Sequence, residues 1–309
     1  MLLAALSQGF APLLAALALL NPAAGAFVGL SQATLMDAEP GAREHNMARW
    51  GLAGSLGVVA GPLLVAGATR AGLGWRASIA ALAVLTALLL ALTWRLPHGT
   101  PAASAGADVR SSGAALARGA REALRALRRR AVVRWLVLLE LSNLMLDVLH
   151  GFLALYVVDV AGASGWWAGM AIVVWAGAGL AGDALLIPLL RRVSGVRWLR
   201  GSALAALVVY PAFLLVPALG AKLALLGVLA LLRAGWYAIL KGRLYGAMPG
   251  RSATVLAVAN VAGLVGSLLP LALGLAAERW GLGTAMWLLL AAPAALVVGL
   301  PRDAVRLDA

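Results

Sequence analysis

Long apolar stretches separated by short polar segments dominate the chain. A short apolar stub covers residues 2–10, and nine longer stretches follow it. Each of the nine holds about 20 residues or more, the length that a helix needs to cross about 30 Å of hydrocarbon. We expect membrane spans near residues 11–37, 51–71, 75–95, 134–158, 166–190, 198–219, 221–241, 253–276 and 281–300. The pattern predicts an all-α fold, namely a polytopic helical membrane protein.

The chain also contains an internal repeat. Residues 40–74 align without a gap with residues 249–283, and 12 of these 35 positions are identical, among them Pro40, Gly41, Arg70 and Gly72. Repeats of this size in a membrane chain are typical of secondary transporters. The offset of 209 leaves residues 134–209 without a counterpart. We therefore expect a two-half repeat with a truncated first half that lacks two to three N-terminal helices.

Composition excludes several classes of protein. Apolar residues make up 63% of the chain and charged residues 12%, a balance that a soluble domain would not have. The absence of cysteine excludes disulfides and thiolate metal sites. The sequence has no nucleophile elbow, phosphate-binding loop or HExxH pattern. We expect no enzyme activity, no cofactor and no metal.

The net charge of +13 is distributed unevenly along the chain. Of the 25 Lys and Arg residues, 20 fall on one side of the predicted spans. Arg70, Arg76, Lys222 and Arg279 fall on the other side, and Arg233 lies inside a span. The positive-inside rule makes the basic side cytoplasmic, with loops 38–50, 96–133, 191–200 and 242–252 and the C-terminus there. We expect the cytoplasmic (inner) membrane of a prokaryote.

One long polar segment divides the chain into three parts. Residues 1–95 are predicted to form an incomplete N-terminal bundle of the stub and three spans, residues 96–133 a cytoplasmic linker, and residues 134–309 a six-helix bundle. Within the linker, Leu116, Ala120, Leu124 and Leu127 have helical spacing among arginines. Residues 113–130 therefore suit anionic lipid headgroups, or they anchor the topology without a specific ligand. Nucleic acid is not an expected partner between membrane spans.

The span near residues 134–158 carries the most candidate chemistry. Glu140, Asn143, Asp147 and His150 fall within a stripe about 80° wide on a helix that turns about 100° per residue. Such a stripe must face the bundle interior or a water-filled cavity. Asp147 and His150 then belong to a substrate or proton site, because these groups bind and release protons when solvent access alternates. The alternative is a hydrogen-bond network that fixes only packing.

Further polar candidates within the spans are Asp183, Arg233 and Asn260. Asp183 and Arg233 lie at a depth similar to that of Glu140, so we expect Arg233 to pair with one of the two carboxylates. Alternatively, Arg233 binds an anionic or aromatic substrate together with Trp236 and Tyr237. Asn260 is either a packing amide or a residue that lines the cavity.

Two halves, a basic loop between them and six spans after the loop resemble the major facilitator superfamily. Residues 25–43, with Gly25, Asp37, Pro40 and Arg43, resemble the end of that family's fourth helix and its cytoplasmic turn. Gly57, Gly61 and Pro62 match the G-x-x-x-G-P core of its fifth-helix motif, although Val65 and Ala66 stand where the family has a Gly-Gly pair. These glycines are expected to allow close helix packing, either as a rocking surface or without directional meaning.

The resemblance implies alternating-access transport of a small-molecule organic solute across the lipid bilayer, with proton-coupled export as the leading interpretation. An uptake symporter for a metabolite is the alternative within transport. A non-transporting pseudo-transporter fragment or scaffold is the alternative outside it, because missing helices would remove part of the wall around a central cavity.

Overall fold

The computed structural model describes residues 1–94 and 121–301. In these ranges every regular element is a helix, because a chain in hydrocarbon must satisfy its backbone hydrogen bonds internally. Nine helical segments are long and apolar enough to cross a membrane. They cover Phe10–Ala38, Pro40–Arg70, Gly74–Thr93, Arg130–Val160, Gly165–Leu189, Gly195–Leu215, Leu219–Gly246, Ser252–Trp280 and Leu282–Gly299. The predicted all-α, polytopic fold is confirmed.

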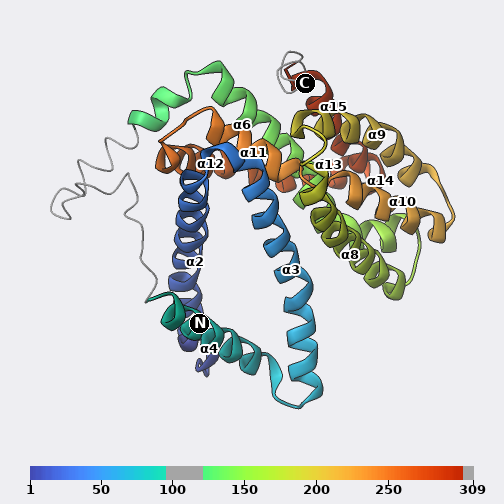
Figure 1. The fold of residues 1–309 in the computed structure, drawn as a ribbon. Helices are drawn as coiled ribbons and strands as arrows, with labels where there is room; N and C mark the ends of the chain where they lie inside the picture. The colour runs from blue at the N-terminus through green and yellow to red at the C-terminus, as the bar shows by residue number, and fades with distance from the viewer. Residues whose placement is uncertain (95–120, 302–309) are drawn as a thin grey trace.

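The N-terminal part of the chain holds few helices, and they are loosely packed (Figure 1). Its elements are α1 (Leu2–Ala5), α2 (Phe10–Ala38), η1 (Pro40–Ala42), α3 (Arg43–Arg70) and α4 (Gly74–Thr93). α3 packs against α8 (Gly165–Leu189) and α11 (Trp236–Gly246), and α2 contacts α12 (Ser252–Gly266). In the span Pro40–Arg70, no residue of the most apolar 18-residue stretch is buried. The described N-terminal helices therefore contact the C-terminal helices mainly at one end, and most of the apolar surface of the N-terminal helices is exposed.

The C-terminal part holds the core. Its further elements are α6 (Arg130–Asn143), η3 (Leu144–Val148), α7 (Leu149–Leu155), η4 (Tyr156–Val160), α9 (Gly195–Leu215), α10 (Leu219–Leu232), α13 (Leu268–Trp280), α14 (Leu282–Ala285), η5 (Met286–Leu290) and α15 (Ala291–Gly299). Large aromatic side chains at its centre are buried, among them Tyr156, Tyr210, Phe213 and Trp236. Tyr210 donates a hydrogen bond of 2.8 Å to the carbonyl of Met286, so α9 is joined to η5.

Two spans of the C-terminal part are irregular. The span Arg130–Val160 contains two π-helical segments, η3 and η4, in which hydrogen bonds reach five residues along the chain. The span Leu219–Gly246 breaks between α10 and α11, where Gly235 has a φ of 82°. That left-handed conformation favours glycine, and an added Cβ at Gly235 would lie 2.7 Å from a methyl of Leu186.

The sequence repeat extends to the backbone. Gly72 follows α3 with a φ of 74°, and its counterpart in the repeat, Gly281, follows α13 with a φ of 81°. Both positions therefore have a positive φ, which favours glycine, whereas the neighbouring pair differs because Gly74 has a φ of 70° and Gly283 has no positive φ. α3 is continuous where its counterpart is divided into α12 and α13.

Most of the predicted linker lies outside the described residues. Residues 95–120, which include the Pro/Gly/Ser-rich segment and the start of the expected basic helix at 113–130, are not described. Residues 121–126 are helical. Here Ala123 and Ala126 are buried, whereas Leu124 on the predicted apolar stripe is 64% exposed.

Candidate functional site

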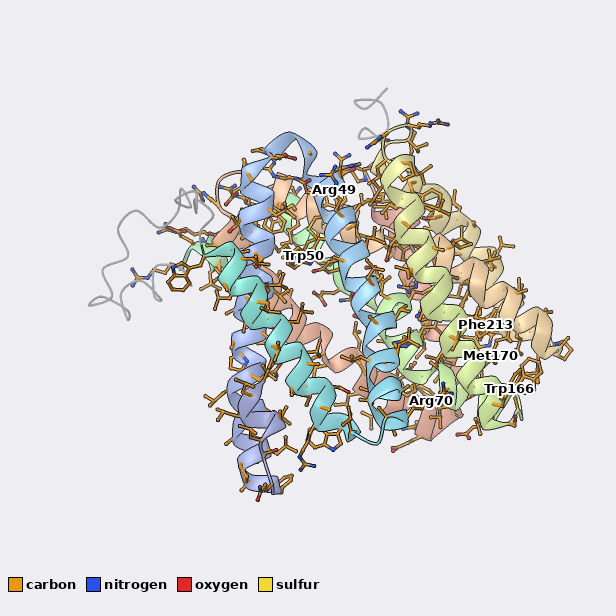
Figure 2. All side chains as sticks on the ribbon, turned by 60° about the horizontal axis from the view of Figure 1, so that its bottom comes forward. Arg49, Trp50, Arg70, Trp166, Met170 and Phe213 are labelled. Atoms are coloured by element: carbon orange, nitrogen blue, oxygen red, sulfur yellow. The ribbon has the colours of Figure 1, made fainter. Side chains whose placement is uncertain are left out.

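A cavity of about 350 Å³ lies between α3 and the C-terminal helices. Its polar and aromatic lining comes from Trp50, Ser55, Asn143, Asp147, Asp183, Arg233 and Tyr237. Trp50 lies near the start of α3, well away from Arg70 at the end of the same helix (Figure 2). Four residues that the sequence predicted as candidates thus line one cavity, although they come from three separate spans: Asn143, Asp147, Asp183 and Arg233.

Asp147 reaches this cavity from a π-helical segment. It lies in η3, where the N–H of Leu149 bonds to the carbonyl of Leu144. The Asp147 side chain is exposed, and it forms no ion pair or hydrogen bond with the residues that the structure describes. A π-turn holds about one residue more than an α-turn, so it rotates the flanking side chains by up to about 100° relative to a continuous α-helix.

The predicted stripe on this span is consequently divided. The Glu140 carboxylate accepts a hydrogen bond of 3.3 Å from Asn143 but lies against Gly266, in a separate groove of about 380 Å³ between α6 and α12. His150 is exposed and does not line the cavity of Asp147. The expectation of one cavity-facing stripe for all four residues is wrong, because only Asn143 and Asp147 line the cavity. η3 shifts the helical phase before His150, whereas Glu140 precedes η3 on α6 and lies in the other groove.

Arg233 occupies the end of α10 beside the cavity. Its guanidinium stacks over the Trp175 ring at 4.3 Å, and its Nη2 atom fills the space where an added Cβ on Gly179 would lie only 2.5 Å away. Its Nε atom is buried without a hydrogen-bond partner among the described residues. The expected ion pair with Glu140 or Asp183 does not form there.

Asp183 has a different partner. It accepts a hydrogen bond of 2.5 Å from the hydroxyl of Ser55 on α3, which joins the N-terminal and C-terminal parts beside the cavity. Arg233 and Asp183 interact only electrostatically, at a separation beyond an ion pair. Glu140 in turn interacts electrostatically with Lys241, a buried cation on α11 at the last position of the predicted span 221–241.

Three other predicted residues are placed as follows. Trp236 is fully buried and donates a 2.9 Å hydrogen bond to Ser202, so it belongs to the core and not to a substrate pathway. Tyr237, the next residue, lines the cavity. Asn260 is exposed on α12 and lines none of the cavities described here. Adjacent helical residues point about 100° apart, which explains why Trp236 and Tyr237 separate.

The predicted glycine seam is not a packing surface within the described chain. An added Cβ at Gly57 or Gly61 would meet no atom within 4 Å, and Pro62 lies inside a continuous α3. Within residues 1–94 and 121–301, no second helix therefore packs against these two glycines. Close approach occurs instead on α8, where an added Cβ at Gly182 would lie 2.8 Å from the Cβ of Ala234.

Sequence reasoning missed two cavity residues, Trp50 and Ser55, both on α3. Ser55 is the one polar side chain in residues 51–66, and that isolation is a signal by which it could have been found. Trp50 offered none, because tryptophan near a span end is typical of an interfacial belt.

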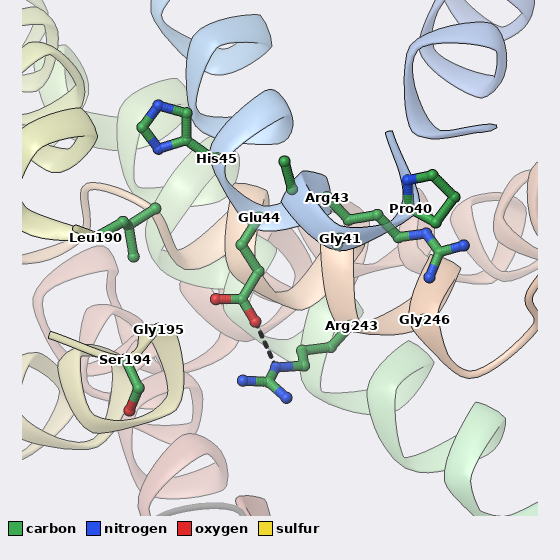
Figure 3. A pocket seen from close by; sticks show the side chains of 12 residues that line it. Pro40, Gly41, Arg43, Glu44, His45, Leu190, Ser194, Gly195, Arg243 and Gly246 are labelled. Carbon is green, nitrogen blue, oxygen red and sulfur yellow. Dashed lines mark ion pairs between the residues drawn. The ribbon is translucent and has the colours of Figure 1, made fainter. Parts of the chain in front are cut away.

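A second cluster joins α3 to α11 away from the cavity (Figure 3). Glu44 forms an ion pair with Arg243, and Gly195 and Gly242 leave room for the Glu44 side chain. These residues line a pocket of about 420 Å³ at the α2–α3 turn. Near the same end, Tyr245 donates to Gln32 at 3.2 Å and Ser252 donates to Asp37 at 2.5 Å.

The described residues contain no group of three or more His, Asp or Glu that could hold a metal ion. The fold and the cavity define a class: a polytopic helical membrane protein with a polar cavity between its spans. The chain belongs to the Major Facilitator Superfamily, whose sequence profile matches residues 1–242. Neither a search of curated proteins nor a search of solved structures found a match.

Proposed function

We propose that the chain moves a small organic solute by alternating access, with export coupled to proton entry. The observation that carries this proposal is the Asp147 carboxylate, which faces a cavity between the two parts of the chain and has no ion-pair partner among the described residues. A carboxylate in that position can hold either a proton or a cationic solute group, and it cannot hold both. Competition for one carboxylate couples the two fluxes in opposite directions.

Other charges act on the same carboxylate and must be part of the account. Arg233 at the end of α10 and His150 on α7 interact electrostatically with Asp147, as does Glu140 on α6. Asp183 on α8 lines the same cavity, but its hydrogen bond from Ser55 gives it a partner. Asp147 is therefore the proposed proton carrier, and its neighbours adjust its affinity for protons.

The proposed orientation places the α2–α3 turn in the cytoplasm, on the bias of 20 basic residues among 25. The contacts Glu44–Arg243, Gln32–Tyr245 and Asp37–Ser252 then lie at the cytoplasmic end and hold it closed. Residues 113–130 would meet the anionic headgroups of the inner leaflet of a prokaryotic inner membrane. A cysteine at Ser164 is expected to be labelled only from outside and one at Arg192 only from inside, and the reverse pattern would overturn the orientation.

Transport is tested in liposomes that contain the purified chain and an internal pH dye. A solute gradient should drive proton movement for the unchanged chain, and Asp147→Asn should abolish it while solute exchange without a pH gradient persists. Asp159→Asn is the matched control, because Asp159 is an exposed carboxylate on η4 of the same span. Proton movement by Asp147→Asn equal to that of the control would end the proton role. Flow of solute and protons in the same direction would favour the uptake symporter.

A non-transporting scaffold is the second candidate, and one observation favours it. Only 6% of the most apolar window of α2 and 11% of that of α4 is buried within the described part of the chain, so these two helices contact little of the rest of it. A scaffold would show neither solute exchange nor solute-driven proton movement in the same liposomes.

A further inference from the structure

Two opposite charges face the cavity of about 350 Å³ without neutralising each other. Asp147 approaches from η3 and Arg233 from the end of α10, and no ion pair within 4.0 Å joins them in the described part of the chain. Each charge interacts electrostatically with the other across the cavity. Because Asp147 is exposed and both residues line the cavity, a solute that enters the cavity can contact both charges.

The arginine side of the cavity is built to receive an anion. Among the described residues the buried Arg233 Nε atom has no hydrogen-bond partner, and the guanidinium stacks over the Trp175 ring at 4.3 Å. Beside it, Gly235 is the N-cap of α11, and Gly235, Tyr237 and Ala238 line the cavity. The N-terminus of an α-helix carries partial positive charge and favours carboxylates. The guanidinium and the helix end thus act on one region of the cavity.

The opposite side is built to receive a cation. Asp183 already accepts a hydrogen bond from Ser55, so Asp147 is the cavity carboxylate whose oxygens have no hydrogen-bond donor among the described residues. The rings of Trp50 and Tyr237 also line the cavity, and aromatic faces attract ammonium groups. A carboxylate and aromatic rings together select an ammonium group over a neutral polar one.

We propose that the solute of this cavity is a small zwitterion of amino-acid type, whose ammonium group binds Asp147 and whose carboxylate binds Arg233 and the start of α11. One zwitterion satisfies both charges and loses its translational freedom once, whereas separate ions would lose it twice. The inference rests on the proposed transport function, because it assigns the solute class of the same cavity. The volume agrees with a small organic molecule, which pockets of this size enclose.

The test compares matched probes that differ only in charge. Glycine and L-phenylalanine are the zwitterions, their amides carry only the cation, and their N-acetyl forms carry only the anion. Binding to the detergent-purified chain is measured by calorimetry. At least one zwitterion is expected to bind about 10- to 100-fold more tightly than its amide and its N-acetyl form, since each loses one charged hydrogen-bonded contact.

Two variants assign the contacts. Arg233→Gln should remove the preference for the zwitterion over the amide, and Asp147→Asn should remove the preference over the N-acetyl form. Arg70→Gln, an exposed arginine at the far end of α3, should keep both preferences. Equal binding of a zwitterion and its amide, or no binding of any probe at millimolar concentration, would overturn the inference.

Transport separates this inference from the function on which it rests. If the amides drive proton movement in liposomes and the zwitterions do not, the transport function stands and the solute class is wrong. If a zwitterion binds with both preferences but nothing is transported, the solute class stands and the transport function fails.

Discussion

Replacing Gly182 by alanine tests how closely α8 approaches the end of α10. The new Cβ would lie 2.8 Å from the Cβ of Ala234 and 3.3 Å from the Cα of Leu231, and it would meet the Leu231 carbonyl oxygen at 3.4 Å. Two of these atoms belong to the backbone, so they cannot move aside without shifting α10. Overpacking of this kind costs about 1–3 kcal/mol.

Gly177→Ala on the same helix provides the reference, because a Cβ there would meet nothing within 4 Å. Both changes gain the same helix propensity of about 1 kcal/mol, so the difference between them isolates the cost of overpacking. At about 2–4 °C per kcal/mol, Gly182→Ala should unfold about 2–12 °C below Gly177→Ala.

The measurement is thermal unfolding in one detergent and at one scan rate, followed by tryptophan fluorescence. Equal unfolding temperatures for the two variants would show that α8 and α10 do not meet as closely as described. If Gly182→Ala unfolds at the same temperature as the unchanged chain but loses solute binding at the cavity, the added methyl group has displaced Arg233 instead of destabilising the fold.

Three further outcomes follow from single contacts. Lys222→Met removes an ammonium that donates three hydrogen bonds, of 2.9, 2.7 and 3.1 Å, to the Tyr156 hydroxyl and to the carbonyls of Phe213 and Leu214 at the end of α9. The Leu214 carbonyl keeps a 3.3 Å hydrogen bond from Tyr156, whereas the Phe213 carbonyl loses its side-chain donor, so stability should fall by about 2 kcal/mol in thermal unfolding. Glu44→Gln breaks the partly exposed ion pair with Arg243, which contributes about 0.5–1 kcal/mol. A cysteine introduced at a residue that lines the pocket of Figure 3 should then be labelled about two- to fivefold faster, and an unchanged labelling rate would contradict a closing role for the pair. Trp236→Phe removes one buried hydrogen bond and should cost about 1 kcal/mol, whereas its solute binding should equal that of the unchanged chain.

The membrane spans were predictable because they depend on local apolar length. The last predicted span, residues 281–300, compares with Leu282–Gly299 in the structure. The repeat was equally visible, because it is a match of residue identities, and two of the matched glycines, Gly72 and Gly281, both have a positive φ that favours glycine. These features require no knowledge of which helices become neighbours.

The cavity was only partly predictable, because its geometry depends on tertiary contacts. Asp147, Asp183 and Arg233 stand out in sequence as charges in apolar spans, but the partner of Asp183 is Ser55, which lies 128 positions earlier in the chain. The packing role assigned to Gly57 and Gly61 failed for the same reason, since small residues permit an approach without specifying that a partner is there.

The two π-helical segments of the span Arg130–Val160 have a consequence for comparing related chains. Each segment accommodates about one residue more than an α-helix of the same length, so deleting one residue inside it restores α-helical hydrogen bonding instead of breaking it. Single-residue gaps in an alignment of this span therefore belong within Leu144–Val148 or Tyr156–Val160. A gap in the first segment would turn the residues before it about 100° relative to those after it. Two chains that both keep an aspartate in this span can thus present it to different surroundings.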